Sequence, residues 1–223
     1  GRIRIKDIEP PADAPKPQVP DFEPLAIIKG SRQIFERQGP KGLAQWMKEQ
    51  KQVLFTDTTM RDAHQSLLAT RMRTNDIVKV ANAYSRGLPN LFSLECWGGA
   101  TFDVAMRFLN EDPWERLAQV REGAPNILMQ MLLRGSNGVG YTNYPDNVVQ
   151  FFVAQAAKGG VDVFRVFDCL NWVENMRVAM NSHALTRGSP LFLFADKDQL
   201  YSGNILAQEW QDGEGKKHRL KPA

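Results

Sequence analysis

The amino-acid sequence predicts an α/β fold, in which about the first four to five βα units of a (βα)8 TIM barrel are present. Short apolar runs at 53–55, 91–96, 126–133 and 161–166 alternate with segments of helical spacing, and 191–194 is a candidate fifth strand. Because parallel strands need a helix-sized connection, this alternation favours parallel βα units. No glycine-rich phosphate-binding motif follows the first run, which disfavours a dinucleotide-binding or P-loop fold.

The connections between the runs carry the spacing of amphipathic helices. Helices are expected at 25–52, 76–86, 101–122, 146–158 and 173–183. The first should break at Gly39-Pro40, because proline removes a backbone donor inside a helix. Pro113 should interrupt the third or start a second helix there, since proline is well tolerated in the first helical turn.

Four segments are expected along the chain. Six prolines within 1–24 predict an extended interdomain linker, because proline fixes φ and removes amide donors. Residues 25–52 are predicted as a helical lead-in and 53–181 as the first half of the barrel. Residues 182–223 form a divergent tail, which a deletion, a frameshift or an assembly error would each explain. From 212 onward the tail is mostly glycine and charged residues and is predicted to be disordered.

Composition excludes some classes of protein. The 223 residues are 43% hydrophobic and 24% charged, and the net charge is only +3, with basic residues spread along the chain. We therefore expect neither nucleic acid nor a membrane surface as a partner. No apolar run approaches the roughly 20 residues that span a bilayer. Cys96 and Cys169 lack metal or disulfide spacing and are predicted to be reduced thiols.

Polar side chains gather where each predicted strand ends. They are Arg61, Asp62, His64 and Gln65 after the first strand, Glu95 and Trp97 at the second, Arg134 at the third, and Arg165 and Asp168 at the fourth. The carboxyl ends of barrel strands share one rim, where active sites of this fold are built. Taken singly, each residue is equally compatible with a loop charge or a helix cap. Four successive strands that deliver such groups to one rim predict an active site.

The chemistry of these groups suggests an anion-binding, metal-assisted site. The Asp62 carboxylate is a suitable ligand for a divalent metal ion. Arg61 and Arg134 carry planar guanidinium groups, which match a substrate carboxylate in two-point contact. The Gln65 amide can donate to a carbonyl or enolate oxygen.

Several motifs resemble one known family of enzymes. The motifs are TDTTMRDAHQSLLATR at 56–71, ECWGGATFD at 95–103, QMLLRG at 130–135, YPDN at 144–147 and FRVFD at 164–168. They resemble the biotin-dependent carboxyltransferase barrel, which pyruvate carboxylase, the oxaloacetate decarboxylase α subunit and the transcarboxylase 5S subunit share. The resemblance runs from about residue 25 to about residue 180. The long lead-in before the first motif favours pyruvate carboxylase among the three.

The resemblance implies a reaction and roles for individual residues. A carboxyl group would move from carboxybiotin to pyruvate through a metal-stabilised enolate, giving oxaloacetate. By resemblance, the catalytic candidates are Arg61, Gln65 and Arg134, and the substrate-binding candidates are Arg61, Gln65, Asp103, Arg134 and Tyr141. Asp62 would ligate the metal, expected to be zinc or manganese. Asp168 matches a motif position near the metal, with its role left open.

The resemblance also implies groups that other parts of a longer protein would supply. Biotin would be carried on a separate carrier domain, and ATP would be used by another domain of a ligase. The parent would be a homotetramer in the bacterial cytoplasm, or in the mitochondrial matrix if the source is eukaryotic.

Some features of the family are missing from this sequence. The family supplies a carboxylated lysine and a His-x-His pair as metal ligands, whereas the only histidines are His64, His183 and His218. Lys197-Asp198 imitates the lysine motif, but it comes one strand after the fourth and is interpreted as a coincidence. We therefore predict that this chain alone is inactive. A non-catalytic, truncated module is the alternative of another class.

Structural roles, rather than roles in a site, are also considered for a histidine, a tyrosine and two methionines. His64 is predicted to be a structural hydrogen-bonding residue, and Tyr141 is alternatively a packing aromatic. Met129 and Met131 are predicted to lie in the core or in a pocket wall.

Overall fold

The computed structural model of the chain describes residues 26–170 and 172–182, and beyond them the backbone of four strands. Several expectations lie outside the described residues, namely the proline-rich linker at 1–24, His183 and Lys197-Asp198.

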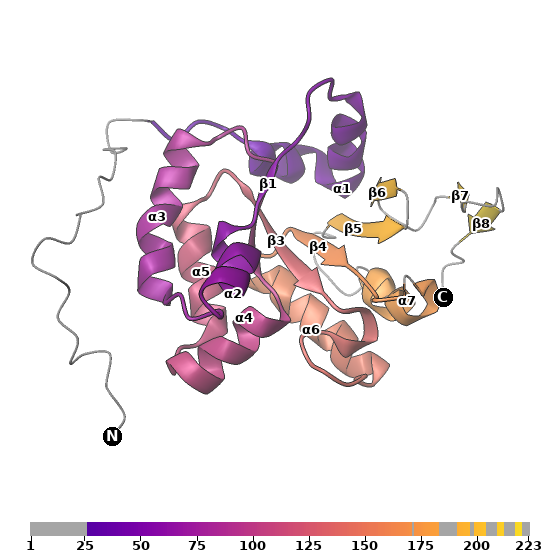
Figure 1. Cartoon of the computed structure of the whole chain (residues 1–223). Coiled ribbons are helices and arrows are strands. Elements are labelled where there is room, and N and C mark those ends of the chain that lie inside the picture. Colours follow the sequence, from indigo (N-terminus) through magenta and orange to yellow (C-terminus); the bar gives the residue numbers. More distant parts are fainter. Residues whose placement is uncertain are drawn as a thin grey trace, which may run out of the picture.

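Five parallel strands form most of a six-stranded sheet. The strands are β1 (Thr56–Asp57), β2 (Ser93–Trp97), β3 (Leu128–Leu133), β4 (Val163–Val166) and β5 (Leu191–Asp196). They lie side by side in sequence order, and each neighbouring pair is parallel. This order is that of successive barrel strands, so the α/β prediction of a partial barrel is confirmed. The carboxyl ends of these strands meet along one rim (Figure 1).

Helices connect the strands as the sequence predicts. They include α3 (Thr74–Gly87), α4 (Gly99–Val104), α5 (Pro113–Gly123), α6 (Asp146–Gly159) and α7 (Val173–Asn181). Between α4 and α5 the chain forms a π-helical turn, η3 (Ala105–Leu109), so the long third helix is split as expected. Pro113 starts α5, and the Asp112 carboxylate accepts the amide of Trp114 at 2.8 Å. None of the described helices is long and apolar enough to cross a membrane.

The first strand differs from the prediction. The pairing residues are Thr56 and Asp57 rather than 53–55, and Val53 and Phe55 are 77% and 67% exposed. β1 is the edge of the sheet, so within the described residues these apolar side chains have a strand, β2, on one side only. The chain then turns at once into a π-helical turn, η2 (Thr59–Ala63), and the short helix α2 (His64–Leu67).

The tail departs from the βα pattern after β5. β6 (Gln199–Gly203) pairs antiparallel with β5, and β7 (Glu209–Gln211) pairs antiparallel with β8 (Lys217–Arg219). β8 lies within the segment from 212 onward for which disorder is expected, and that expectation stays a prediction. Antiparallel neighbours can be joined by a short connection, whereas a parallel pair needs a crossover of a dozen or more residues.

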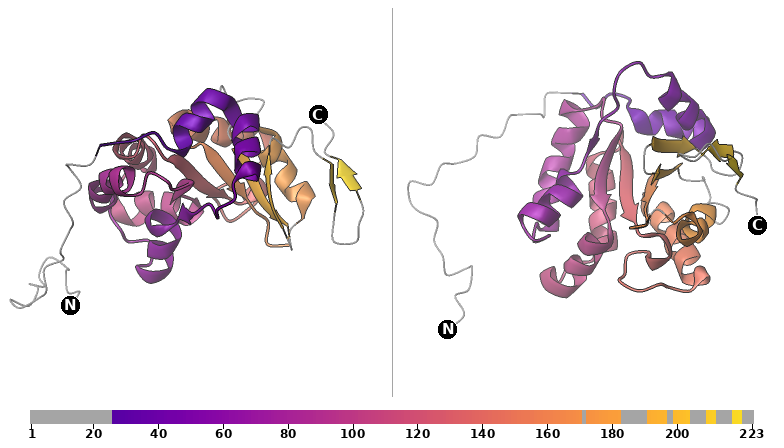
Figure 2. Two further views of the ribbon diagram at one scale, coloured as in Figure 1. Left: turned by 90° about the horizontal axis from the view of Figure 1, so that it is seen from above. Right: turned by 45° about the vertical axis from the view of Figure 1, so that its right-hand side comes forward.

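The lead-in segment forms α1 (Ser31–Glu49) and closes the amino-terminal end of the sheet (Figures 1 and 2). The expected break occurs at Gly39, whose φ of 67° lies in the left-handed region that favours glycine. The fully buried Leu43 packs in a cluster with Leu128 of β3 and Val163 of β4. The inner face of the curved sheet is thus apolar at this end.

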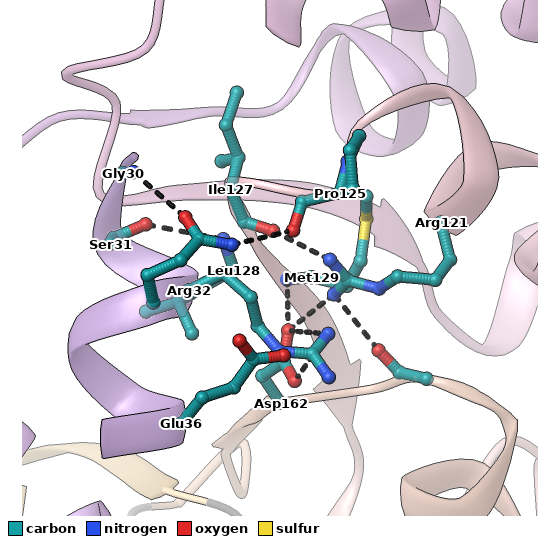
Figure 3. A network of polar contacts seen from close by, with 12 residues as sticks. Gly30, Ser31, Arg32, Glu36, Arg121, Pro125, Ile127, Leu128, Met129 and Asp162 are labelled. Atoms are coloured by element: carbon teal, nitrogen blue, oxygen red, sulfur yellow. Dashed lines mark hydrogen bonds and ion pairs between the residues drawn. The ribbon is translucent and has the colours of Figure 1, made fainter. Parts of the chain in front are cut away.

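A buried carboxylate joins α1 to the sheet at the same end (Figure 3). Asp162, whose side chain is 5% exposed, forms ion pairs with Arg32 of α1 at 3.1 Å and with Arg121 of α5. Its Oδ2 also accepts the backbone N–H of Met129 at 2.9 Å. Nearby, the Ser31 hydroxyl accepts the amide of Leu128 at 3.2 Å. The lead-in helix is therefore bound to the sheet by charge and by apolar packing.

The outer face of the sheet carries the main core. Met129 and Met131 are fully buried there, which confirms the core prediction. Four rings pack mutually in this layer with centroids 4.9–6.0 Å apart, namely Trp97, Phe102, Trp114 and Phe152. Most of these pairs are edge-to-face, and Trp97 and Phe152 are stacked; both arrangements stabilise the layer that holds α4, α5 and α6 on β2.

Candidate active site

A chain of polar side chains crosses the inner face of the sheet above its apolar end. The hydroxyl groups of Thr56 on β1 and Ser93 on β2 lie 2.7 Å apart. Ser93 donates to Oε1 of Gln130 on β3 at 3.1 Å, and Nε2 of Gln130 donates to Oε2 of Glu95 at 2.6 Å. Ser93, Glu95 and Gln130 are at most 2% exposed. The inner face is therefore a connected hydrogen-bond network rather than a second apolar core.

Glu95 is the centre of this network and binds two guanidinium groups. Arg165 of β4 donates to it through Nε at 2.8 Å and Nη2 at 2.9 Å. Arg61 of η2 lies with Nε 2.6 Å from Oε1. Burial alone would raise the pKa of Glu95, but the hydrogen bonds from Arg165 and Gln130 and the charges of both arginines lower it below its usual 4.5. Glu95 is thus a buried carboxylate that stays ionised.

The first motif brings three predicted site residues together on η2 and α2. Arg61 is 4% exposed, and its Nη1 donates to Oε1 of Gln65 at 3.3 Å. Nη2 of Arg61 lies 3.3 Å from Oδ1 of Asp62, whose side chain is 52% exposed. Single π-helical turns recur at functional sites, where they redirect side chains. Here the turn aims one guanidinium at both a carboxylate and an amide.

The third strand supplies Arg134 and Tyr141. Arg134 follows β3, and its Nη1 donates to the carbonyl of Gly140 at 3.3 Å. Its Cζ lies 5.4 Å from the centroid of the Tyr141 ring, within the range of a cation–π contact. Tyr141 is 67% exposed, which favours the site reading over the alternative of a packing aromatic.

The carboxylates of Asp103 and Asp168, both predicted site residues, pair with groups close to them in the sequence. Asp103 of α4 pairs with Arg107 one turn later, at 3.2 Å. Asp168 accepts the backbone amides of Leu170 and Trp172 at 2.8 and 3.1 Å, and Asn175 donates to it at 2.6 Å. These bonds lower the pKa of Asp168. Asp168 thus fixes the loop that leads into α7, and within the described residues no hydrogen bond or ion pair links either carboxylate to Arg61.

His64 has the contacts of a structural residue, as predicted. Its ring lies in a buried position, and Nε2 donates to the carbonyl of Met60 at 2.8 Å, while Nδ1 has no partner among the described residues. Burial lowers the pKa of His64 below 6.5, and the charges of Arg116 and Arg61 add to this, against the raising effect of the Met60 bond. The neutral ring is therefore the folded form.

The pH dependence of stability follows from this lowered pKa. The unfolded chain takes up a proton near pH 6.5, whereas folded His64 resists it, so the contribution of His64 is complete above about pH 6.5 and is lost as the pH falls below that value. We expect the unfolding free energy of the protein to fall between pH 7 and 5, and His64→Gln, which keeps the donor, to remove part of that fall. Urea unfolding of both proteins at several pH values measures the difference. Equal pH slopes would contradict this assignment.

The metal prediction rests on Asp62 alone. Among the described residues no group of three or more histidine, cysteine, aspartate or glutamate side chains is placed to hold a metal ion. Asp62 is half exposed and one of its oxygens faces Arg61. These residues therefore do not make a metal site by themselves.

Sequence reasoning named Glu95 and Arg165 as rim residues but gave neither a partner, and it assigned nothing to Gln130. The sequence contains a signal for the pairing of Glu95, because a charged residue inside an otherwise apolar strand is buried and a buried charge needs a partner. Trp97 was misplaced on the rim. The pairing register shifts between Glu95 and Trp97, and this bulge turns the indole into the outer aromatic layer.

Known proteins were compared with this chain at the level of sequence. No family model matches it. The pyruvate carboxylase of Bacillus subtilis is 62% identical over 154 residues, which is 69% of this chain and 13% of the relative. That of Staphylococcus aureus is 59% identical over 185 residues, 83% of this chain and 16% of the relative. The human protein named "Pyruvate carboxylase, mitochondrial" is 54% identical over 180 residues, 81% of this chain and 15% of the relative.

Solved structures agree with the sequence comparison. The carboxyltransferase domain of Rhizobium etli pyruvate carboxylase, in complex with oxamate and biotin, superposes with a TM-score of 0.79 at 63% identity. This match covers 86% of the present chain and 32% of that chain. The same domain with pyruvate and biocytin gives a TM-score of 0.78 at 63% identity, over 85% of this chain and 31% of that one.

The chain belongs to the pyruvate carboxylase family. Its resemblance to the carboxyltransferase barrel is therefore confirmed, both in sequence and in fold. The chain spans 13–16% of the length of the three pyruvate carboxylases from Bacillus, Staphylococcus and human, so the activity of a whole pyruvate carboxylase is a matter for proposal.

Proposed function

We propose that the described residues form the front part of a carboxyltransferase site, in which a carboxyl group passes from carboxybiotin to pyruvate to give oxaloacetate. The parent would be a biotin- and ATP-dependent ligase, with biotin on a carrier domain, ATP used by another domain and a homotetrameric assembly. The support is the similarity to a pyruvate carboxylase domain solved with pyruvate and biocytin. A bacterial cytoplasmic location stays a prediction, as does a mitochondrial one.

The observation that carries the proposal is the geometry of Arg61. Nε of Arg61 lies 2.6 Å from the carboxylate of buried Glu95. Of its terminal nitrogens, Nη1 faces Gln65 and Nη2 faces Asp62. We propose that these terminal nitrogens and Arg134 hold the pyruvate carboxylate, because a guanidinium fork matches a carboxylate in two-point contact. Tyr141, in contact with Arg134, would line the pyruvate and biotin pockets.

Gln65 is proposed to bind the reacting oxygen. Because its Oε1 accepts from Arg61, its amide nitrogen is the end left to donate to the ketone oxygen of pyruvate. That oxygen gains negative charge as the enolate forms, so a fixed donor there stabilises the transition state more than the ground state.

Asp62 is proposed as one ligand of a divalent metal ion, zinc or manganese, with the other ligands outside the described residues. When bound, the ion would supply Lewis-acid stabilisation of the enolate. Asp103 would lie near the substrate and Asp168 near the metal, although both now pair locally. Since Asp62 alone makes no metal site, these residues by themselves are predicted to be inactive.

The carboxyl transfer can be tested apart from ATP chemistry by running it in reverse. Full-length protein that carries this chain should release pyruvate from oxaloacetate when free biotin is added. Arg134→Met should reduce this release about 100-fold, because one carboxylate contact is lost, whereas Arg177→Met, at an exposed pair with Glu174, should not. No biotin-dependent release by the unaltered protein would favour the non-catalytic module.

A second prediction concerns the room beside Arg61. A Cβ on Gly98 would lie 2.9 Å from Cδ of Arg61 and 3.6 Å from Cβ of Leu132. Arg61 is buried and fixed on Glu95, so the contact must displace it. Gly98→Ala is expected to lower kcat/KM for pyruvate by about 10- to 100-fold, since small misplacements of a binding group are costly. Steady-state kinetics with a normal unfolding midpoint would confirm this, and unchanged kinetics would contradict it.

A further inference from the structure

We infer that Glu95 is a positioning residue, which fixes the side chain of Arg61 in the orientation that receives the substrate carboxylate. This inference rests on the proposed function and adds a residue to it. Glu95 itself lies beneath the site, fully buried, and acts through Arg61 rather than on the substrate.

The geometry leaves Arg61 one orientation. A guanidinium presents one edge through Nε and others through its two terminal nitrogens. Glu95 takes Nε at 2.6 Å, so the terminal nitrogens are turned away from Glu95 and toward Gln65 and Asp62. The edge of the guanidinium that carries the two terminal nitrogens, which can bind a ligand, therefore faces the rim.

Glu95 is itself held from two further sides. Gln130 donates to Oε2 at 2.6 Å, and Arg165 donates to both carboxylate oxygens at 2.8 and 2.9 Å. These partners come from β3 and β4, whereas Arg61 comes from η2, so one carboxylate ties the site turn to two strands. A side chain held by this many bonds has a single rotamer available, and it can orient a neighbour.

The charges around Glu95 also favour an anion beside Arg61. One carboxylate faces two guanidinium groups, so the positive charges of Arg61 and Arg165 are only partly neutralised by Glu95. Asp62, the next acidic group, is half exposed and contacts a single terminal nitrogen of Arg61. The buried group of Arg61, Arg165 and Glu95 thus has more positive than negative charge, and the half-exposed Asp62 offsets this only in part because water screens it, so a small carboxylate substrate is favoured above Glu95.

Removing the charge of Glu95 should release Arg61. In Glu95→Gln the shape is kept, but Nε of Arg61 loses its ionic partner and the long side chain can rotate toward Asp62. Because the ion pair that orients Arg61 is buried, we expect its loss to lower kcat/KM for pyruvate about 10- to 100-fold. Most of the change should lie in KM, because the substrate carboxylate is bound in the ground state as well.

The test compares three variants of the full-length, biotin-loaded protein in pyruvate-dependent oxaloacetate formation. Glu95→Gln should raise KM for pyruvate and leave bicarbonate-dependent ATP cleavage unchanged. Glu174→Gln, at an exposed pair with Arg177, is the matched control and should change neither. Because two buried arginines facing a neutral amide can impair folding, Glu95→Gln with Arg165→Met restores the charge balance; its midpoint of thermal unfolding should recover while KM stays raised.

The results distinguish a failure of the positioning role of Glu95 from a failure of the proposed function. A merely structural role would lower kcat through loss of folded enzyme and leave KM unchanged, or would restore KM in the double variant, and either result overturns the inference. If Arg61→Met also leaves pyruvate kinetics unchanged, the proposed function fails rather than the positioning role alone.

Discussion

Asp162→Ala is expected to lower the free energy of unfolding of the protein by about 3–5 kcal/mol, the typical cost of breaking a buried ion pair. The carboxylate is 5% exposed, forms ion pairs with Arg32 and Arg121, and accepts the amide of Met129. Without it, Arg121 stays in a poorly solvated place with no carboxylate partner among the described residues. Arg32 keeps only its ion pair with Glu36 of the same helix, at 3.2 Å, so α1 loses its ionic link to the sheet (Figure 3).

Urea unfolding measures this effect, and hydrogen exchange locates it. Amides of α1 should lose protection more than those of α6, because the ion pairs of Asp162 within the described residues go to Arg32 of α1 and Arg121 of α5. Glu174→Ala removes a carboxylate of the same charge from an exposed pair and should leave the midpoint nearly unchanged. If Asp162→Ala behaved like this control, the apolar packing around Leu43 and the hydrogen bond between Ser31 and Leu128 would be sufficient to hold α1.

Arg61→Met is expected to give the largest loss of activity, a fall in kcat/KM for pyruvate of about 100- to 1000-fold. Methionine keeps much of the side-chain volume but removes the charge and every donor. Arg61→Lys should also be impaired by more than about tenfold, because an ammonium group cannot contact Glu95, Gln65 and a carboxylate together.

The kinetics of oxaloacetate formation by the full-length protein measure this prediction. Arg177→Met, on the exposed face of α7, serves as the matched control and should keep its kinetics. A normal unfolding midpoint for Arg61→Lys would show that the loss arises in the site. Wild-type pyruvate kinetics in Arg61→Met would exclude Arg61 from substrate binding.

Much of the fold could be predicted, because periodic spacing reports directly on burial. Apolar runs located β2 to β5, and Pro113 and Gly39 marked a helix start and a break as expected. β1 was misplaced because the run 53–55 is apolar but lies before the paired residues. The antiparallel β6 could not be anticipated, since strand direction depends on tertiary pairing rather than on local spacing.

The site was predictable in its members but not in its contacts. The motif at 56–71 identified Arg61, Asp62 and Gln65 through resemblance, and the structure places them together. The role of Glu95 depends on a carboxylate and two arginines from three separate segments, and such a meeting follows from the register of β2, β3 and β4. The loop contacts of Asp168 could not be assigned for a similar reason, because a carboxylate that binds nearby amides and a free one look alike in sequence.

The most direct test of the proposed site is a crystal structure of the full-length protein with pyruvate bound. The proposal predicts the pyruvate carboxylate within hydrogen-bonding distance of the terminal nitrogens of Arg61 and of Arg134, and the ketone oxygen facing the amide nitrogen of Gln65. Pyruvate bound at a place remote from Arg61, with Glu95 and Arg61 still paired beneath an unliganded rim, would contradict it.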